Sequence, residues 1–140
     1  FFKKKNLICL SDDSGLEIDL LDGRPGIYSS RWGGKNKNFD LAIKKVFDEM
    51  SNINKNWQTK SNARFVCSMT LYYPDGKSFS STGTINGKIS AEKKGRNGFG
   101  YDPIFIPTGY NQTFAEMKYK RKISIDHRYK AYKKIKKFFS

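Results

Sequence analysis

Hydrophobic residues form short runs in some segments of the chain and recur at helical spacing in others. This pattern predicts a protein that combines strands with helices. Short apolar runs, bounded by glycine, proline or aspartate, predict strands at 7–11, 16–21 and 63–73 and another that ends at Pro107. A Pro-Asp-Gly turn follows residue 73, so the chain is expected to return antiparallel over 77–85. Gly83 and Gly87 in and after this segment suggest bulges or close packing.

Two segments carry apolar residues at helical spacing. Residues 38–50 place them on one face, and residues 127–139 repeat the pattern with lysines on the other face. A loop with one helical turn is expected at 24–34, and a helical turn at 113–117. No repeat or linker divides the chain, so we predict a single domain over 1–140, of the α/β or α+β class, with a mixed sheet.

Length and composition are those of a globular protein. The 140 residues are enough for one domain with a core, and 37% hydrophobic residues argue against disorder. No run approaches the ~18 apolar residues that a membrane helix needs, so no membrane partner is expected. Cys9 and Cys67 lie in apolar runs, which predicts buried, reduced thiols in a cytoplasmic protein rather than a disulfide.

The charge is strongly basic. Lysine and arginine number 27 against 13 acidic residues, a net charge of +14, and such a field attracts polyanions. Only 6 of the basic residues are arginine, the residue that reads base edges and phosphates, so we favour a solvated surface over a nucleic-acid face. A basic nucleic-acid-binding module that uses residues 118–137 is the main alternative function.

Three clusters carry candidate chemistry, and the first is Ser-Asp-Asp-Ser-Gly at 11–15. Adjacent carboxylates after an apolar run supply the hard oxygens that Mg²⁺ prefers. One aspartate could also hold a water and take its proton. The alternative is a polar turn in which the carboxylates cap backbone N–H groups.

The second cluster is Gly-Arg-Asn-Gly-Phe-Gly-Tyr-Asp-Pro at 95–103. Glycines on both sides of Phe99 let the backbone approach a ligand closely, while the ring offers a face on which a planar base could stack. The alternative is a glycine-rich hairpin in which Phe99 fills the core.

The third cluster is Lys122 with Asp126, His127 and Arg128. A neutral histidine and an arginine can both donate hydrogen bonds to a carbonyl oxygen, and this would distinguish a 6-oxo purine from a 6-amino purine. The alternative is that the chain's single histidine caps or packs the start of the last helix.

Taken in chain order, the motifs SDDSGLEIDLLDGRPGIYSSRWGG, ARFVCSMTLYYPDGK, GRNGFGYDPIFIPTGYNQTFAEM and a final His-Arg pair closely resemble the inosine/xanthosine triphosphate pyrophosphatase family. The resemblance runs from about residue 7 to the C-terminus. It implies an α/β fold of two lobes around a long mixed sheet, with the active site in the cleft between them. It also implies a homodimer that uses Mg²⁺ to split purine nucleoside triphosphates into monophosphate and pyrophosphate, removing damaged nucleotides from the pool.

The resemblance also implies roles for single residues. Asp13 matches the catalytic proton acceptor and metal-associated carboxylate, Asp12 supports it at the metal, and Ser14 matches a substrate contact. The residues that match the base-binding positions are Phe99, Gly100, Tyr101, Asp102, Lys122, His127 and Arg128.

Two departures from the family pattern matter. The family opens with a strand, a Thr/Ser-x-Asn-x-x-Lys loop that binds the triphosphate, and helices that carry a metal-associated glutamate. We therefore expect residues 1–140 to lack the N-terminal part of the domain, to leave Phe1 and Phe2 without apolar neighbours, and to be poorly active or an inactive fragment. Asp126 stands where the family usually has serine, and it is expected either to hold Arg128 or Lys122 in place or to repel substrate.

Overall fold

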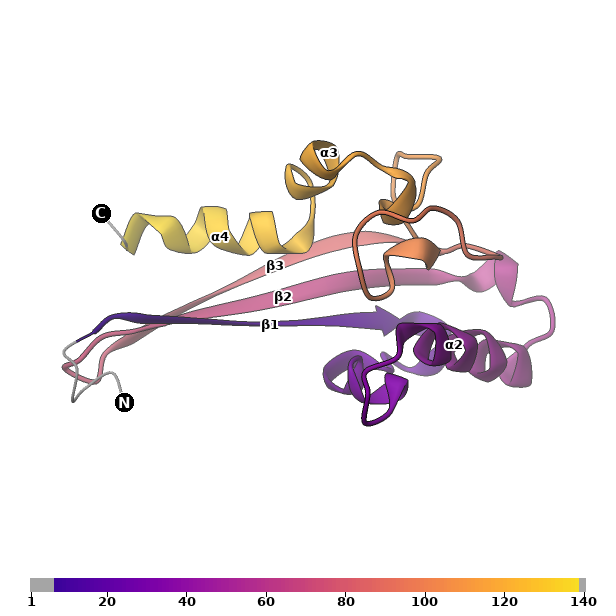
Figure 1. The fold of residues 1–140 in the computed structure, drawn as a ribbon, viewed down its shortest axis with the longest axis horizontal. Coiled ribbons are helices and arrows are strands. Elements are labelled where there is room, and N and C mark those ends of the chain that lie inside the picture. Colours follow the sequence, from indigo (N-terminus) through magenta and orange to yellow (C-terminus); the bar gives the residue numbers. More distant parts are fainter. Residues whose placement is uncertain (1–6, 139–140) are drawn as a thin grey trace.

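The computed structural model describes residues 7–138 and is built on a four-stranded sheet (Figure 1). The strands are β1 (Cys9–Ile18), β2 (Asn62–Tyr72), β3 (Ser78–Ile89) and β4 (Phe105–Pro107). They lie in the order β1-β2-β3-β4, and every neighbouring pair is antiparallel. The α/β fold is confirmed, whereas the mixed strand directions that we expected do not occur among the described residues. The expectation for Phe1 and Phe2 falls outside this part of the chain.

A single strand, β1, replaces the two strands expected at 7–11 and 16–21. The polar residues at 11–14 had suggested a turn, but they continue the strand as exposed or half-buried positions. Because β1 pairs only with β2 and forms an edge of the described sheet, it tolerates polar side chains that a central strand would not. The two candidate carboxylates therefore lie within a strand, and the alternative of a polar turn is wrong.

Within residues 7–138, three α-helices accompany the sheet: α2 (Phe39–Ile53), α3 (Tyr119–Ile123) and α4 (His127–Ile135). The helix predicted at 38–50 is confirmed as α2, whose N-cap Asn38 accepts hydrogen bonds from two backbone N–H groups. The predicted C-terminal helix is confirmed as α4, and a 3-10 turn at 136–138 continues it. Sequence patterning had not predicted α3. In Figure 1, α2 lies beside the C-terminal end of β1, and α4 runs along the sheet beside β3.

Short 3-10 turns connect these elements. Two of them, Gly26–Tyr28 and Arg31–Gly33, occupy the loop in which one turn was expected, and Phe114–Glu116 confirms the turn predicted at 113–117. The others are Asp19–Leu21, Trp57–Lys60 and Asp102–Ile104.

The core follows alternate residues of β2, which point to one face of the sheet. Ala63 and Phe65 join a cluster with α2 and with Phe105 and Phe114. Farther along the strand, a second cluster packs β2 against α4, and its buried members are Cys67, Met69, Leu71, Ala131 and Ile135. β2 thus contributes to both clusters, one with α2, Phe105 and Phe114 and the other with α4.

Gly83 and Gly87 confirm the close packing that we expected of them. A Cβ at Gly83 would collide with the backbone carbonyl of His127 and the backbone nitrogen of Ala131. At Gly87, a Cβ would collide with β4. The absence of a side chain at Gly83 lets the first turn of α4 lie directly on the sheet.

Both cysteines are free, as predicted. Cys67 is buried, and burial raises its pKa to about 11, whereas Cys9 is only half-buried. None of the helices formed by residues 7–138 has the length and apolarity needed to cross a membrane.

Candidate active site

A cavity of about 230 Å³ opens where β1, the start of α4 and the segment 95–103, called the glycine-rich loop below, meet. All ten residues singled out from the sequence contribute to its lining: Asp12, Asp13, Ser14, Phe99, Gly100, Tyr101, Asp102, Lys122, His127 and Arg128. Three clusters that are far apart in the sequence thus form one site.

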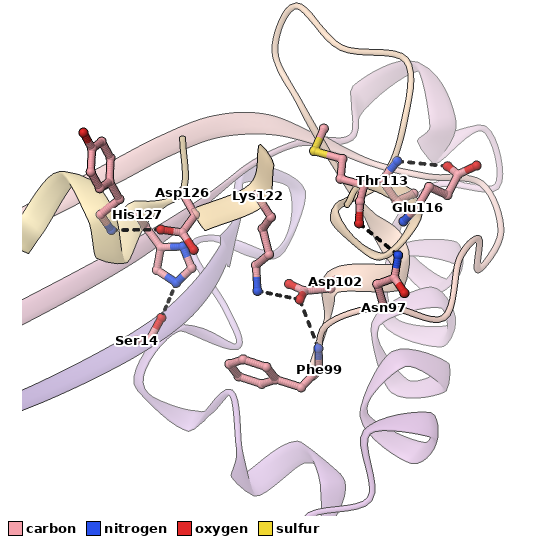
Figure 2. Close-up of polar contacts among 11 residues, drawn as sticks. Ser14, Asn97, Phe99, Asp102, Thr113, Glu116, Lys122, Asp126 and His127 are labelled. Carbon is pink, nitrogen blue, oxygen red and sulfur yellow. Dashed lines mark hydrogen bonds and ion pairs between the residues drawn. The ribbon is translucent and has the colours of Figure 1, made fainter. Parts of the chain in front are cut away.

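Phe99 lies at the tip of the glycine-rich loop, and its side chain is 63% exposed, so it does not fill the core. Gly98 and Gly100 on either side have φ angles of +72° and +65°, which residues with a side chain rarely adopt. The backbone N–H of Phe99 donates to the Asp102 carboxylate at 3.0 Å, and Asn97 donates its side-chain amide to the Met117 carbonyl at 3.0 Å (Figure 2). The ring is therefore presented to solvent by a loop that is held at both sides.

Asp102 and Lys122 form a buried ion pair behind Phe99. Their side chains are 5% and 7% exposed, and Lys122 Nζ lies 2.7 Å from Asp102 Oδ2 (Figure 2). Burial raises the pKa of Asp102, while the hydrogen bond from Lys122 opposes that shift. Lys122 Nζ also lies 4.7 Å from the centroid of the Phe99 ring. Asp102 thus orients both the loop and the lysine.

Tyr101 forms part of the cavity wall. Its side chain is buried, and its hydroxyl donates to the Ser29 carbonyl at 2.5 Å. Burial raises the pKa of this phenol, so it is neutral near pH 7. Its ring packs edge-on against Phe39 at 5.4 Å. Tyr101 therefore ties the glycine-rich loop to the loop that follows β1.

Asp126 caps α4, and this corrects the expectation that it holds Arg128 or Lys122 in place. Its carboxylate accepts the backbone N–H of Tyr129 at 2.8 Å, and the residue is 4% exposed. It pairs with neither Arg128 nor Lys122, which bind Asp12 and Asp102 instead, and it is not among the residues that line the cavity. Serine and aspartate are both strong N-cap residues, so the departure from the family pattern preserves the helix start.

His127 is buried at the base of the cavity and stacks on Phe65, with ring centroids 4.8 Å apart. Its Nε2 lies 2.5 Å from the Ser14 hydroxyl (Figure 2). Its Nδ1 is buried without a hydrogen-bond partner among residues 7–138. Burial, and then the charges of Arg128 and Lys122, lower its pKa to about 3, so the imidazole is neutral in the folded protein near pH 7. His127 thus has a packing role, and it also lines the cavity.

We predict that stability falls below about pH 6.5 because of His127. The unfolded chain binds a proton with an ordinary pKa of 6.5, whereas the folded chain binds it only near pH 3, despite the opposing charge of Asp12. Between these values the unfolded state holds more protons, which removes at most about 1.4 kcal/mol of stability per pH unit. Thermal unfolding from pH 7 to pH 5 should show a steeper loss for the wild type than for His127→Gln. Since the chain has one histidine, parallel curves would contradict the prediction.

Arg128 and Asp12 form an ion pair at the rim of the cavity. Arg128 Nε lies 2.7 Å from Asp12 Oδ2, and the two side chains are 37% and 40% exposed. The guanidinium carbon lies 5.7 Å from the centroid of Phe99. The exposed ring therefore has a cationic group from Lys122 and another from Arg128 beside it.

The Asp13 side chain points to the opposite face of β1 from that of Asp12, because successive side chains of a strand alternate between the two faces. Asp13 lies across from Ser68 of β2 and borders both the main cavity and a second one, of about 160 Å³. Its carboxylate makes no hydrogen bond or ion pair with any of residues 7–138. It is therefore available to a ligand.

A magnesium ion fits this donor set only together with a substrate. The described residues hold no group of three or more His, Cys, Asp and Glu side chains that could bind a metal alone. Mg²⁺ usually takes one or two carboxylates and completes its shell with water and substrate phosphates. Asp13 could supply the carboxylate.

Sequence reasoning missed several residues of the cavity wall, among them Ser29, Phe39 and Phe65. Ser29 accepts the backbone N–H of Leu16 at 2.9 Å through its hydroxyl. In the sequence, Phe39 and Phe65 have the pattern of ordinary core residues, and Ser29 lies in a loop without a motif. No local signal separates them from their neighbours.

Several known proteins are related to this chain in sequence. A dITP/XTP pyrophosphatase from Exiguobacterium sibiricum is 45% identical over 130 residues, which are 90% of this chain and 62% of that protein. One from Zymomonas mobilis is 40% identical over 95% of this chain and 63% of that protein. The chain therefore spans a little under two thirds of the length of these relatives.

A solved structure of the Staphylococcus aureus Ham1 protein has the same fold. It is 38% identical and superposes with a TM-score of 0.88 over 98% of this chain and 69% of that one. A Ham1 protein from Coxiella burnetii is 34% identical, with a TM-score of 0.87 over 95% of this chain and 67% of that one. The sequence profile of the Ham1 family matches residues 1–138, and the chain belongs to that family.

Proposed function

We propose that this protein hydrolyses inosine and xanthosine triphosphates, in ribo and deoxy forms, to the monophosphate and pyrophosphate, and so removes damaged purines from the nucleotide pool. The observation that carries the proposal is one cavity in which an exposed aromatic ring stands beside two cationic side chains, with an unpaired carboxylate at the rim. The names of the relatives, dITP/XTP pyrophosphatases, support the same reaction.

The purine stacks on Phe99 in this proposal. Lys122 and Arg128 lie near that ring and carry only hydrogen-bond donors, so they match a 6-oxo group. A 6-amino group would place donor against donor, and leaving buried polar groups unpaired is a strong form of discrimination. Ser14, Gly100, Tyr101, Asp102 and His127 complete the pocket, largely by fixing its shape.

The phosphates extend past β1 toward Asp13. Asp13 orients the attacking water and accepts its proton while the water oxygen bonds to the α phosphorus and the bond to the bridging oxygen of pyrophosphate breaks. Mg²⁺, when bound with the phosphates, supplies neutralisation of their charge. We also propose a single domain, a homodimer and a cytoplasmic location, the last supported by the two free cysteines.

The proposal is tested by pyrophosphate release from inosine, xanthosine, adenosine and guanosine triphosphates, with Mg²⁺ and with EDTA. The protein should act on the first two with Mg²⁺ and on none of the four with EDTA. Binding of single-stranded DNA that weakens steeply with salt, without turnover of any nucleotide, would favour the nucleic-acid-binding alternative.

Phe99→Ala is predicted to weaken the binding of inosine monophosphate by ~1–3 kcal/mol, the scale of base–aromatic stacking. Because the ring is exposed, the melting temperature should change little. Titration calorimetry measures the affinity. Tyr119→Ala is the matched control, since Tyr119 is 69% exposed and lies outside the cavity lining. Equal affinities for Phe99→Ala and the wild type would remove Phe99 from the base site.

A further inference from the structure

We infer that Asp12 is a positioning residue for base recognition, which holds Arg128 beside Phe99, and that it is not a metal ligand. The inference rests on the proposed function. It assigns Asp12, one of the two adjacent aspartates, to the positioning of Arg128 instead of to metal binding. It follows from the direction of the Asp12 side chain, from its partner and from the strand that carries it.

The direction of the side chain comes from the register of the sheet. Asp12 lies directly across from Met69 of β2, and Ser14 lies across from Cys67. Residues directly opposite in an antiparallel pair share a face, and Met69 and Cys67 pack against α4. Asp12 therefore faces α4, whereas Asp13 faces the other side of the strand.

Asp12 is paired with a single nitrogen atom of the Arg128 guanidinium. Asp12 Oδ2 accepts from Arg128 Nε at 2.7 Å, and the terminal nitrogens of that guanidinium make no hydrogen bond with residues 7–138. A guanidinium has five N–H donors in a rigid plane, so a carboxylate that binds Nε fixes the plane and leaves the terminal N–H groups to a ligand. The plane so fixed lies next to the exposed Phe99 ring.

The same strand holds the neighbouring residue of α4 as well. Ser14 contacts His127 through its hydroxyl, so alternate residues of β1 bind consecutive residues at the start of α4. The strand that carries Asp13 is thereby attached at two points to the helix that carries Arg128. Asp12 thus connects Arg128, on the side of the site proposed to bind the base, to the strand that carries Asp13, on the side proposed to bind the phosphates.

The same geometry argues against a metal at Asp12. A guanidinium 2.7 Å away already neutralises the carboxylate and would repel a divalent cation. Two adjacent residues of one strand also point to opposite faces, so Asp12 and Asp13 do not converge on a single ion.

The test measures inosine monophosphate binding in EDTA, which needs neither metal nor turnover. Asp12→Ala should weaken this binding by about three- to tenfold, the scale of a half-exposed ion pair with a charge-assisted hydrogen bond, and should reduce the preference for inosine over adenosine monophosphate. The matched control is Asp19→Ala, which breaks a comparably exposed pair of Asp19 with Arg64, 2.6 Å apart and outside the cavity. The control should bind like the wild type.

Two further measurements isolate the mechanism. The double variant Asp12→Ala/Arg128→Ala should bind no more weakly than Arg128→Ala alone, because Asp12 acts through Arg128. The Mg²⁺ concentration for half-maximal pyrophosphate release should be unchanged in Asp12→Ala. Additive losses in the double variant, an increased Mg²⁺ requirement, or unchanged monophosphate binding would each overturn the inference while leaving the proposed function standing. A wild-type protein that neither binds inosine monophosphate nor releases pyrophosphate would overturn both.

Discussion

Asp13→Asn is expected to lower Mg²⁺-dependent pyrophosphate release from inosine triphosphate by about 10²–10⁴-fold, the usual contribution of a general base. Asparagine keeps the shape of the side chain but cannot accept the proton of the attacking water and carries no charge for a metal. Binding of inosine monophosphate in EDTA should be retained, because Phe99 and Arg128 are unaffected. Steady-state kinetics and calorimetry separate the two effects.

Asp22→Asn is the control for this substitution. Asp22 is exposed, has a φ of +56° that asparagine also adopts readily, and lies outside the cavity lining. The charge change is identical, so its turnover should match the wild type. Turnover of Asp13→Asn within a few-fold of that control would exclude Asp13 as the base.

The second large effect concerns stability. Lys122→Met is predicted to lower the free energy of unfolding by about 3–5 kcal/mol, because it leaves the buried Asp102 carboxylate without its cation. The backbone N–H of Phe99 would be the only hydrogen-bond donor left to that carboxylate among the described residues. Urea unfolding, followed by circular dichroism, measures the difference.

Lys44→Met provides the comparison. Lys44 pairs with Asp48 one turn along α2 at 2.8 Å, but the two side chains are 72% and 58% exposed. Loss of such a pair costs less than about 1 kcal/mol. Similar losses for Lys122→Met and Lys44→Met would mean that burial does not strengthen the interior pair.

The elements that could be predicted were those whose signals are local. The helix α2 has an N-cap residue and one apolar face, and the hairpin of β2 and β3 has a Pro-Asp-Gly turn between two runs of strand-forming residues. The strand β1 was divided in error because its polar residues lie on an edge strand. Whether a strand is at the edge depends on pairing with residues about 50 positions away, which no local pattern reports.

That these residues would line one cavity could be predicted from the motifs, but the contacts among them could not. Arg128 and Asp12 are 116 residues apart in the sequence, and only the packing of α4 on the sheet brings them together. Asp126 is different, because its role was readable and was missed. An aspartate directly before an amphipathic segment is a common N-cap signal, yet its proximity to Lys122 and Arg128 suggested an ion pair.

Gly83 gives position 83 an influence on the placement of α4 that no contact with a ligand would reveal. The spacing between α4 and the sheet there leaves no room for a side chain, since a Cβ would meet the backbone of His127. A larger residue is expected to displace the start of α4, which carries His127 and Arg128, the partners of Ser14 and Asp12. Under the proposed function, a substitution at position 83 is therefore expected to weaken the preference for 6-oxo purines, although Gly83 lies outside the cavity lining.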